Sequence, residues 1–202
     1  MVISIKEIEK INNIYGKFII GSLYKGRLKK VVNLVNLKNK KILDIGFGYG
    51  ILILFIKNKT EKIYGININE FQTKKTKEIL FNEGINVSNL ITGDITKKTE
   101  FNDSFFNVIF ANSVLEHIKH LDSALIETKR ILDDSGYFIV STPTENFFYL
   151  IGRSIFGFKK PEDHYNDFMF IEYKLKRYFN VLKTLDYPSP LFPLYRIVLC
   201  KK

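Results

Sequence analysis

Hydrophobic positions recur at two different spacings along the chain, and each spacing predicts one kind of element. Near the start, Ile8, Ile11, Ile14 and Phe18 recur every three or four residues, which predicts an amphipathic helix. The same helical spacing continues over residues 23–37 and predicts a second helix there.

From residue 40 onward, short and almost uniformly apolar runs alternate with longer stretches of helical spacing. The apolar runs predict buried strands over residues 40–45, 62–66, 89–92, 106–111 and 137–141. The intervening stretches predict helices over residues 50–57, 69–82 and 121–132, with DDSG at 133–136 as a stop and turn. Strands that alternate with helices predict a parallel sheet with helices on both faces.

The last part of the chain breaks this alternation. Residues 180–185 and 195–200 are predicted as two strands, and only DYPSPLFPL lies between them. This connection leaves no room for a crossover helix, so we expect the two strands to pair antiparallel. Without a linker, repeat or low-complexity segment, residues 1–202 are predicted to form a single domain.

Composition excludes several classes of protein. The chain has 202 residues, 46% of them hydrophobic, and a net charge of +10. Only five of the 31 basic residues are arginine, the residue that phosphate and base recognition favour, so we attribute the charge to compositional bias and expect no nucleic-acid partner. The single Cys200 excludes a disulfide within the chain and a cysteine metal site. The longest apolar run, 147–158, is too short to span a bilayer, and the N-terminus does not resemble a signal peptide, so a cytoplasmic location is expected.

The stretch ILDIGFGYG, residues 42–50, has three glycines directly after a predicted buried strand. Its spacing, G-x-G-x-G, differs from the G-x-G-x-x-G of dinucleotide-binding proteins. Asp44 lies just before the first glycine, where an acid disfavours a phosphate and suits a cationic ligand. The stretch therefore favours a positively charged nucleoside over NAD. A plain strand–turn–helix with flexible glycines remains the alternative at this point.

Later segments add to this motif, namely IYGININE, GDI, DSFFNVIFANSVLEHI and RILDDSGYFIVSTP. With them the chain resembles the class I S-adenosylmethionine-dependent methyltransferases, specifically the methyltransferase type 11 group. The resemblance is close over residues 40–143 and looser towards the C-terminus. It implies an α/β fold, a doubly wound, seven-stranded, mostly parallel Rossmann-like sheet with an antiparallel last strand. It also implies S-adenosylmethionine as the cofactor.

The resemblance assigns cofactor contacts residue by residue. Those at the methionine part would be Asp44, Gly46, Phe47, Gly48 and Gly50. Those at the adenine would be Asp94 and Ile95, and those at the sulfonium would be Asn112 and Ser113.

The end of the second predicted strand departs from the family pattern. The family usually has an acid there to hold the ribose hydroxyls, whereas this chain has Asn67, followed by Ile68. An amide loses a charge-assisted hydrogen bond, worth roughly 1–2 kcal/mol. Either Asn67 binds the ribose more weakly with help from Glu70, or cofactor binding is compromised.

His117 is the leading candidate for a catalytic base. Methyl transfer mainly requires proximity and alignment, and a base is needed only where the acceptor must lose a proton. The resemblance implies that His117, which follows the fourth strand, lies near the substrate. A structural or helix-capping histidine is the alternative.

The loop PEDHYNDF, residues 161–168, gathers several titratable groups. The resemblance implies that residues 144–170 form an acceptor-site insertion, in which His164 is the second candidate base and Tyr165 and Asp163 contact the substrate. A surface loop before a helix capped by aspartate is the alternative.

The resemblance and the apolar run before this loop together suggest a small or lipid-linked acceptor. We expect methylation at oxygen in a sugar, glycolipid or isoprenoid-like compound, with the helices within about 4–37 as a cap over the cofactor and substrate. The basic charge leaves peripheral contact with an anionic membrane open. The rivals are an RNA or protein methyltransferase and a non-catalytic partner subunit. Without an H-E-x-x-H motif, a cysteine cluster or an acidic triad, no metal is expected.

Overall fold

The computed structural model describes residues 18–60, 62–146 and 164–202, with side chains from residue 21 onward. Most of the first predicted helix and the apolar run 147–158 lie outside the described residues. The helices are α2 (Phe18–Val32), α3 (Ile51–Ile56), α4 (Glu70–Asn82), the 3-10 turn η1 (Leu115–His117), α5 (Leu121–Ile131) and α7 (Phe168–Tyr178). The strands are β1 (Ile42–Ile45), β2 (Ile63–Asn67), β3 (Leu90–Thr92), β4 (Phe106–Asn112), β5 (Leu132–Pro143), β6 (Asn180–Ser189) and β7 (Phe192–Lys201).

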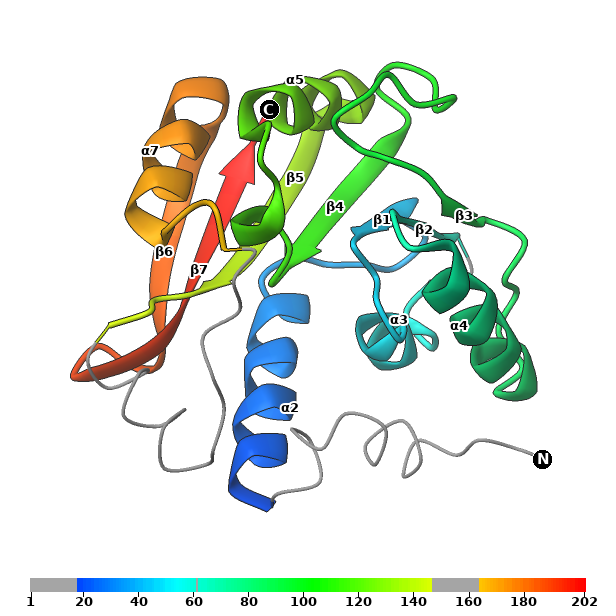
Figure 1. The fold of residues 1–202 in the computed structure, drawn as a ribbon, viewed down its shortest axis with the longest axis horizontal. Helices are drawn as coiled ribbons and strands as arrows, with labels where there is room; N and C mark the ends of the chain where they lie inside the picture. The colour runs from blue at the N-terminus through cyan, green and yellow to red at the C-terminus, as the bar shows by residue number, and fades with distance from the viewer. Residues whose placement is uncertain (1–17, 61, 147–163) are drawn as a thin grey trace.

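The seven strands form one sheet in the order β3-β2-β1-β4-β5-β7-β6 (Figure 1). Strands β1 to β5 pair parallel, and β7 pairs antiparallel with both β5 and β6. This arrangement confirms the predicted doubly wound sheet with its antiparallel last strand. None of the described helices is long and apolar enough to cross a membrane.

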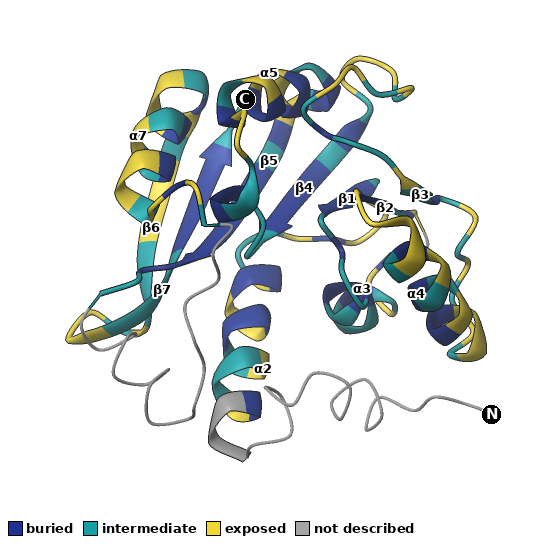
Figure 2. Cartoon of the chain, in the orientation of Figure 1, coloured by how far each residue is buried: buried dark blue, intermediate teal, exposed yellow. Residues whose placement is uncertain are grey.

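Helices cover both faces of the sheet and make two separate cores. Successive strand residues point to opposite faces, so Ile42 of β1 packs towards α2 and α3 whereas Leu43 packs towards α5 and α7. In Figure 2 the central strand β4 and the later part of β5 are mostly buried, while α4 and α7 show exposed outer faces. The uniform apolarity of the predicted strands follows from this double cover.

Strand β5 begins earlier than predicted. It starts at Leu132 instead of Tyr137, and DDSG lies inside it. Phe106 pairs with Leu132 and Val108 with Tyr137, so the extra residues form a bulge in the ladder. The sequence correctly marks DDSG as turn-forming, but in the structure these residues bend β5 while its pairing with β4 continues.

The terminal hairpin is also longer than predicted. The segment DYPSPLFPL was expected to separate the strands, yet most of it belongs to β6 or β7. Pro188 and Pro193 are register partners at the far end of the hairpin. Pro188 is tolerated because β6 is an edge strand. Pro193 is tolerated because the pairing of β7 with β5 begins only at Tyr195.

Candidate active site

The three glycines after β1 adopt left-handed backbone angles, with φ of 67° at Gly46, 52° at Gly48 and 74° at Gly50. A Cβ at Gly46 would lie 2.4 Å from Val114 Cγ2, and one at Gly50 would lie 2.8 Å from Leu80 Cδ1. These two glycines are therefore needed for packing. A Cβ at Gly48 would meet only the Gly46 carbonyl oxygen, at 3.9 Å, so a ligand can approach the backbone here.

Asp44 lies inside β1, in register with Gly65 of β2 and Phe110 of β4. Its side chain is 3% exposed, and among the described residues it has no hydrogen bond or ion pair. Burial raises the pKa of the Asp44 carboxyl well above its usual range. A buried carboxylate without a partner is costly, and a cationic ligand would supply the missing charge.

Asn112 ends β4 and has a second set of unsatisfied polar atoms. Both polar atoms of its amide are buried and lack a hydrogen-bond partner among the described residues. The buried hydroxyl of Ser141, its register partner on β5, also lacks one. Because side chains alternate along a strand, Asn112 and Ser141 point to the same face of the sheet as Asp44. Unsatisfied buried polar groups at strand ends are typical of a binding site.

Asn67 ends β2 and is 7% exposed. Its Nδ2 donates to Gln72 Oε1 at 3.0 Å and to the Asn69 carbonyl oxygen at 3.4 Å. These bonds leave the amide oxygen as the atom that can accept from a ligand. The expected help from Glu70 stays a prediction; in the structure its exposed carboxylate pairs with the exposed Lys74 at 2.7 Å.

The other residues assigned to the cofactor differ in exposure. Asp94 Oδ1 accepts from the Thr96 backbone N–H and hydroxyl, at 2.9 and 2.7 Å, and this turn leaves Oδ2 available. Ile95 is buried, whereas the Ile68 side chain is 73% exposed.

The structure brings together the two histidines singled out from the sequence. His117 ends η1 and His164 precedes α7, yet their rings meet edge to face with centroids 4.5 Å apart. The Nδ1 atom of His164 contacts the carboxylate of Glu145, just after β5. Sequence reasoning missed Glu145, and no local pattern around it marks this role.

The segment after His164 is fastened to η1. The Tyr165 backbone N–H donates to the Glu116 carbonyl oxygen at 2.8 Å. The buried Asn166 side chain donates to the carbonyl oxygens of Leu115 at 3.0 Å and Ile118 at 2.7 Å. These contacts of the two residues that follow His164 help to set its position beside His117.

Two described residues of this loop, Tyr165 and Asp167, have the features that the surface-loop alternative expects. Asp167 caps α7 by accepting from the Phe170 backbone N–H at 2.8 Å. The Tyr165 side chain is 58% exposed, and Asp163 lies outside the described residues.

Glu116 is a buried acid beside the histidines, with 2% of its surface exposed. Burial raises the pKa of its carboxyl to about 7, against the opposing charges of His117 and Arg27 and a hydrogen bond from Thr142. That bond is long, at 3.4 Å.

Arg27 of α2 is fully buried at the ends of β4 and β7. Its Nη1 donates to Ser113 Oγ at 2.7 Å, and its guanidinium lies 4.1 Å from the ring centre of Tyr195 and 4.7 Å from that of Tyr24. Sequence reasoning did not single it out. The available signal was an arginine on the same helical stripe as Val31, in a chain whose basic residues are mostly lysine.

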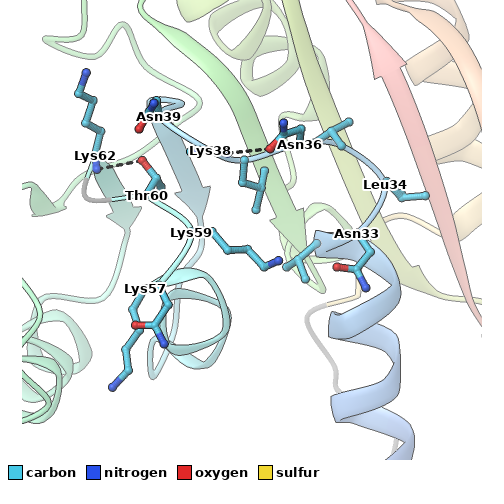
Figure 3. Close-up of a pocket in the computed structure, with 13 residues that line it drawn as sticks. Asn33, Leu34, Asn36, Lys38, Asn39, Lys57, Lys59, Thr60 and Lys62 are labelled. Carbon is cyan, nitrogen blue, oxygen red and sulfur yellow. Dashed lines mark hydrogen bonds between the residues drawn. The ribbon is translucent and has the colours of Figure 1, made fainter.

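Figure 3 shows a pocket at the opposite edge of the sheet, between the end of α2 and the starts of β1 and β2. Its lining is rich in lysine and asparagine, including Lys38, Lys57, Lys59 and Lys62. Asp44, Asn67 and Asn112 lie towards the carboxyl ends of parallel strands, so this pocket is separate from the candidate site.

The strand order, the antiparallel β7 and the glycine loop after β1 together define a class I methyltransferase fold. The methyltransferase domain family matches residues 43–140. In solved structures, an S-adenosylmethionine-dependent methyltransferase from Clostridium acetobutylicum superposes with a TM-score of 0.69 at 17% identity, covering 96% of this chain and 98% of its own. Through the matched residues and its fold, the chain is similar to the class I S-adenosylmethionine-dependent methyltransferases.

Two curated relatives align over part of the chain. Sterol 4-C-methyltransferase strm-1 of Caenorhabditis elegans is 31% identical over 136 residues, which are 67% of this chain and 38% of the relative. Ubiquinone/menaquinone biosynthesis C-methyltransferase UbiE of Paraburkholderia phymatum is 30% identical over 103 residues, which are 50% of this chain and 42% of the relative. The chain thus aligns with about two fifths of the length of these relatives.

Proposed function

We propose that this protein transfers the methyl group of S-adenosylmethionine to a carbon atom of a hydrophobic, lipid-like acceptor. The observation that carries the cofactor assignment is the buried Asp44 carboxylate, which has no partner among the described residues. S-Adenosylmethionine carries an ammonium and a sulfonium, and either charge would compensate this acid. When bound, the cofactor supplies an activated methyl group, and the protein supplies position and alignment.

The residues at the strand ends fit the parts of this cofactor. Gly48 lets the methionine part approach the backbone, and the unsatisfied amide of Asn112 is available to it. The free oxygen of Asn67 accepts from a ribose hydroxyl, and Asp94 Oδ2 accepts from the adenine amine. The remaining contacts in the proposal are Gly46, Phe47, Gly50, Ile68, Ile95 and Ser113.

The nature of the acceptor rests on two separate observations. Both curated relatives are named as C-methyltransferases, one of a sterol and one of ubiquinone/menaquinone biosynthesis, so the expectation of transfer to oxygen gains no support from them. The first turns of α7, which begins four residues after His164, also expose large apolar side chains, with Met169 68% and Tyr173 60% exposed. An apolar surface beside the site suits a lipid-like acceptor.

Transfer of a labelled methyl group tests this function. With S-adenosylmethionine as donor, we expect product with a sterol or a demethylated quinol, because these acceptors combine an apolar body with a nucleophilic carbon. Sugars and RNA, supplied at the same concentration, serve as controls. Label found only in RNA or sugar would contradict the lipid-like acceptor. A chain that binds neither S-adenosylmethionine nor S-adenosylhomocysteine in calorimetry would be a non-catalytic partner.

The Asn67→Asp variant is expected to bind S-adenosylmethionine about tenfold more tightly. A carboxylate restores a charge-assisted hydrogen bond to the ribose, worth roughly 1–2 kcal/mol. Calorimetry measures the change. Asn69→Asp, two residues further on, adds the same charge at an exposed helix cap and should leave the affinity nearly unchanged. Equal gains in both variants would show that general attraction, not ribose contact, is responsible.

A further inference from the structure

Three potential metal ligands converge where η1 meets the segment before α7. One carboxylate oxygen of Glu116 and one ring nitrogen each of His117 and His164 all lie within 4.8 Å of one another. One carboxylate and two imidazoles form a common ligand set for zinc and other divalent transition metals. Around a tetrahedral ion with bonds of about 2.1 Å, ligand atoms are roughly 3.4 Å apart. The three groups would therefore draw together by up to roughly 1.4 Å, a change within reach of side-chain rotation.

The backbone already holds the ligands in place. Glu116 and His117 are neighbours at the end of η1, and the Tyr165 and Asn166 backbone N–H groups both donate to the Glu116 carbonyl oxygen, at 2.8 and 3.3 Å. Together with the Asn166 side-chain bonds to η1, these contacts fix His164 against the other two ligands. A site whose ligands are positioned before the ion arrives loses little conformational entropy on binding.

Glu145 supplies the outer contact that metal-bound histidines usually have. Its carboxylate contacts Nδ1 of His164, which leaves Nε2 as the nitrogen available to an ion. Glu145 itself has φ of 49°, and its neighbours Thr144 and Asn146 each donate to the Pro193 carbonyl oxygen at 2.7 Å. The backbone that carries the Glu145 carboxylate is therefore held by hydrogen bonds on both sides.

Two acidic side chains lie at the cluster of Glu116, His117 and His164, which favours a bound cation. Glu116 is 2% exposed, and the Glu145 side chain is 13% exposed. Arg27 is the buried guanidinium whose charge acts on Glu116. A divalent ion would add positive charge where the Glu116 and Glu145 carboxyl groups lie beside the two imidazoles, in a region of low dielectric.

We propose that Glu116, His117 and His164 bind one divalent transition-metal ion, with Glu145 as the residue that positions His164. Three protein ligands leave at least one coordination position open, and an oxygen atom of the acceptor is the chemical class that fits it. This site replaces the free base expected at His117, because a ring nitrogen that binds an ion cannot also accept a proton. The sequence expected no metal because it has no H-E-x-x-H motif, cysteine cluster or acidic triad; the proposed ligands instead come from two segments that are far apart along the chain.

Metal binding is measured on its own, without methyl transfer, so the result is independent of the proposed function. Untagged wild-type protein is stripped with a chelator, dialysed and titrated with Zn²⁺ in calorimetry and with Co²⁺ in visible absorption. We expect one ion per chain and Co²⁺ bands typical of low coordination. His164→Ala and Glu116→Gln are each expected to weaken Zn²⁺ binding at least tenfold. Glu145→Gln is expected to weaken it roughly tenfold.

His120→Ala is the matched control, because His120 lies three residues from His117, is exposed and belongs to no part of the cluster. It should leave the affinity and stoichiometry unchanged. No stoichiometric binding to the wild type overturns the proposal, whatever the variants do. The proposal also fails if both ions still bind to His164→Ala and Glu116→Gln with wild-type affinity. Thermal unfolding of each variant shows whether a lost ion reflects a lost fold.

Discussion

Replacing Asp44 by asparagine is expected to weaken S-adenosylmethionine binding about 100-fold while making the cofactor-free protein more stable at neutral pH. The loss of affinity follows because a hydrogen bond to a charged partner contributes roughly 1.5–3 kcal/mol, and Asp44 is the acid that the proposed cofactor site offers to the ligand's positive charge. Calorimetry with S-adenosylmethionine measures this part. An affinity within threefold of the wild type would remove Asp44 from the site.

The gain in stability has the opposite sign because burial raises the pKa of the Asp44 carboxyl in the folded protein. An acid with a raised folded pKa keeps its proton in the folded state after the unfolded state has lost it, so stability falls as pH rises from about 4 through the folded pKa. Asparagine has no such dependence. The variant should therefore unfold at a higher temperature than the cofactor-free wild type at pH 7, and the difference should shrink towards pH 4. A variant less stable than the wild type at pH 7 would contradict this account.

The order of the elements could be predicted from the sequence because the sheet is buried on both faces. Mostly apolar runs such as Phe106–Asn112 mark β4 clearly, and the short connection between β6 and β7 indicates that they pair antiparallel. The first and last residues of the strands were predicted less accurately. The turn residues DDSG predict a break in pairing, but they form a bulge within β5. The prolines of the last hairpin also predict a break, but they are tolerated near the edge of the sheet.

The two halves of the candidate site differ in how far sequence predicts them. Asp44 and the glycines that follow it lie within seven residues, and the local motif carries their geometry. The histidine cluster is made by contacts between segments far apart in the chain, because η1 precedes β5 in the sequence whereas Glu145 and His164 follow it. Glu70 is near Asn67 in sequence and pairs with the exposed Lys74, so its contact with the ribose stays a prediction.

Arg27→Met is expected to destabilise the protein by about 3–5 kcal/mol, the usual cost of removing one partner from a buried set of charges. The variant keeps the length and apolar stem of the side chain, but it removes the donor to Ser113 and the positive charge that acts on Glu116. For a chain of this size each kcal/mol lowers the unfolding temperature by roughly 2–4 °C. Thermal unfolding should therefore show a fall of about 10 °C.

Arg27→Lys separates charge from geometry. Lysine keeps the positive charge but has no planar group to stack between the rings of Tyr24 and Tyr195, so an intermediate loss is expected. Lys29→Met is the matched control, because Lys29 lies on the same helix with its side chain exposed, and its replacement should change stability by less than about 0.5 kcal/mol. If Arg27→Met unfolds within 2 °C of the wild type, the buried guanidinium does not hold α2 against the ends of β4 and β7. Because Arg27 links α2 to Ser113, beside the cluster of Glu116 and the two histidines, a large loss would show that the helix and the site form one structural unit.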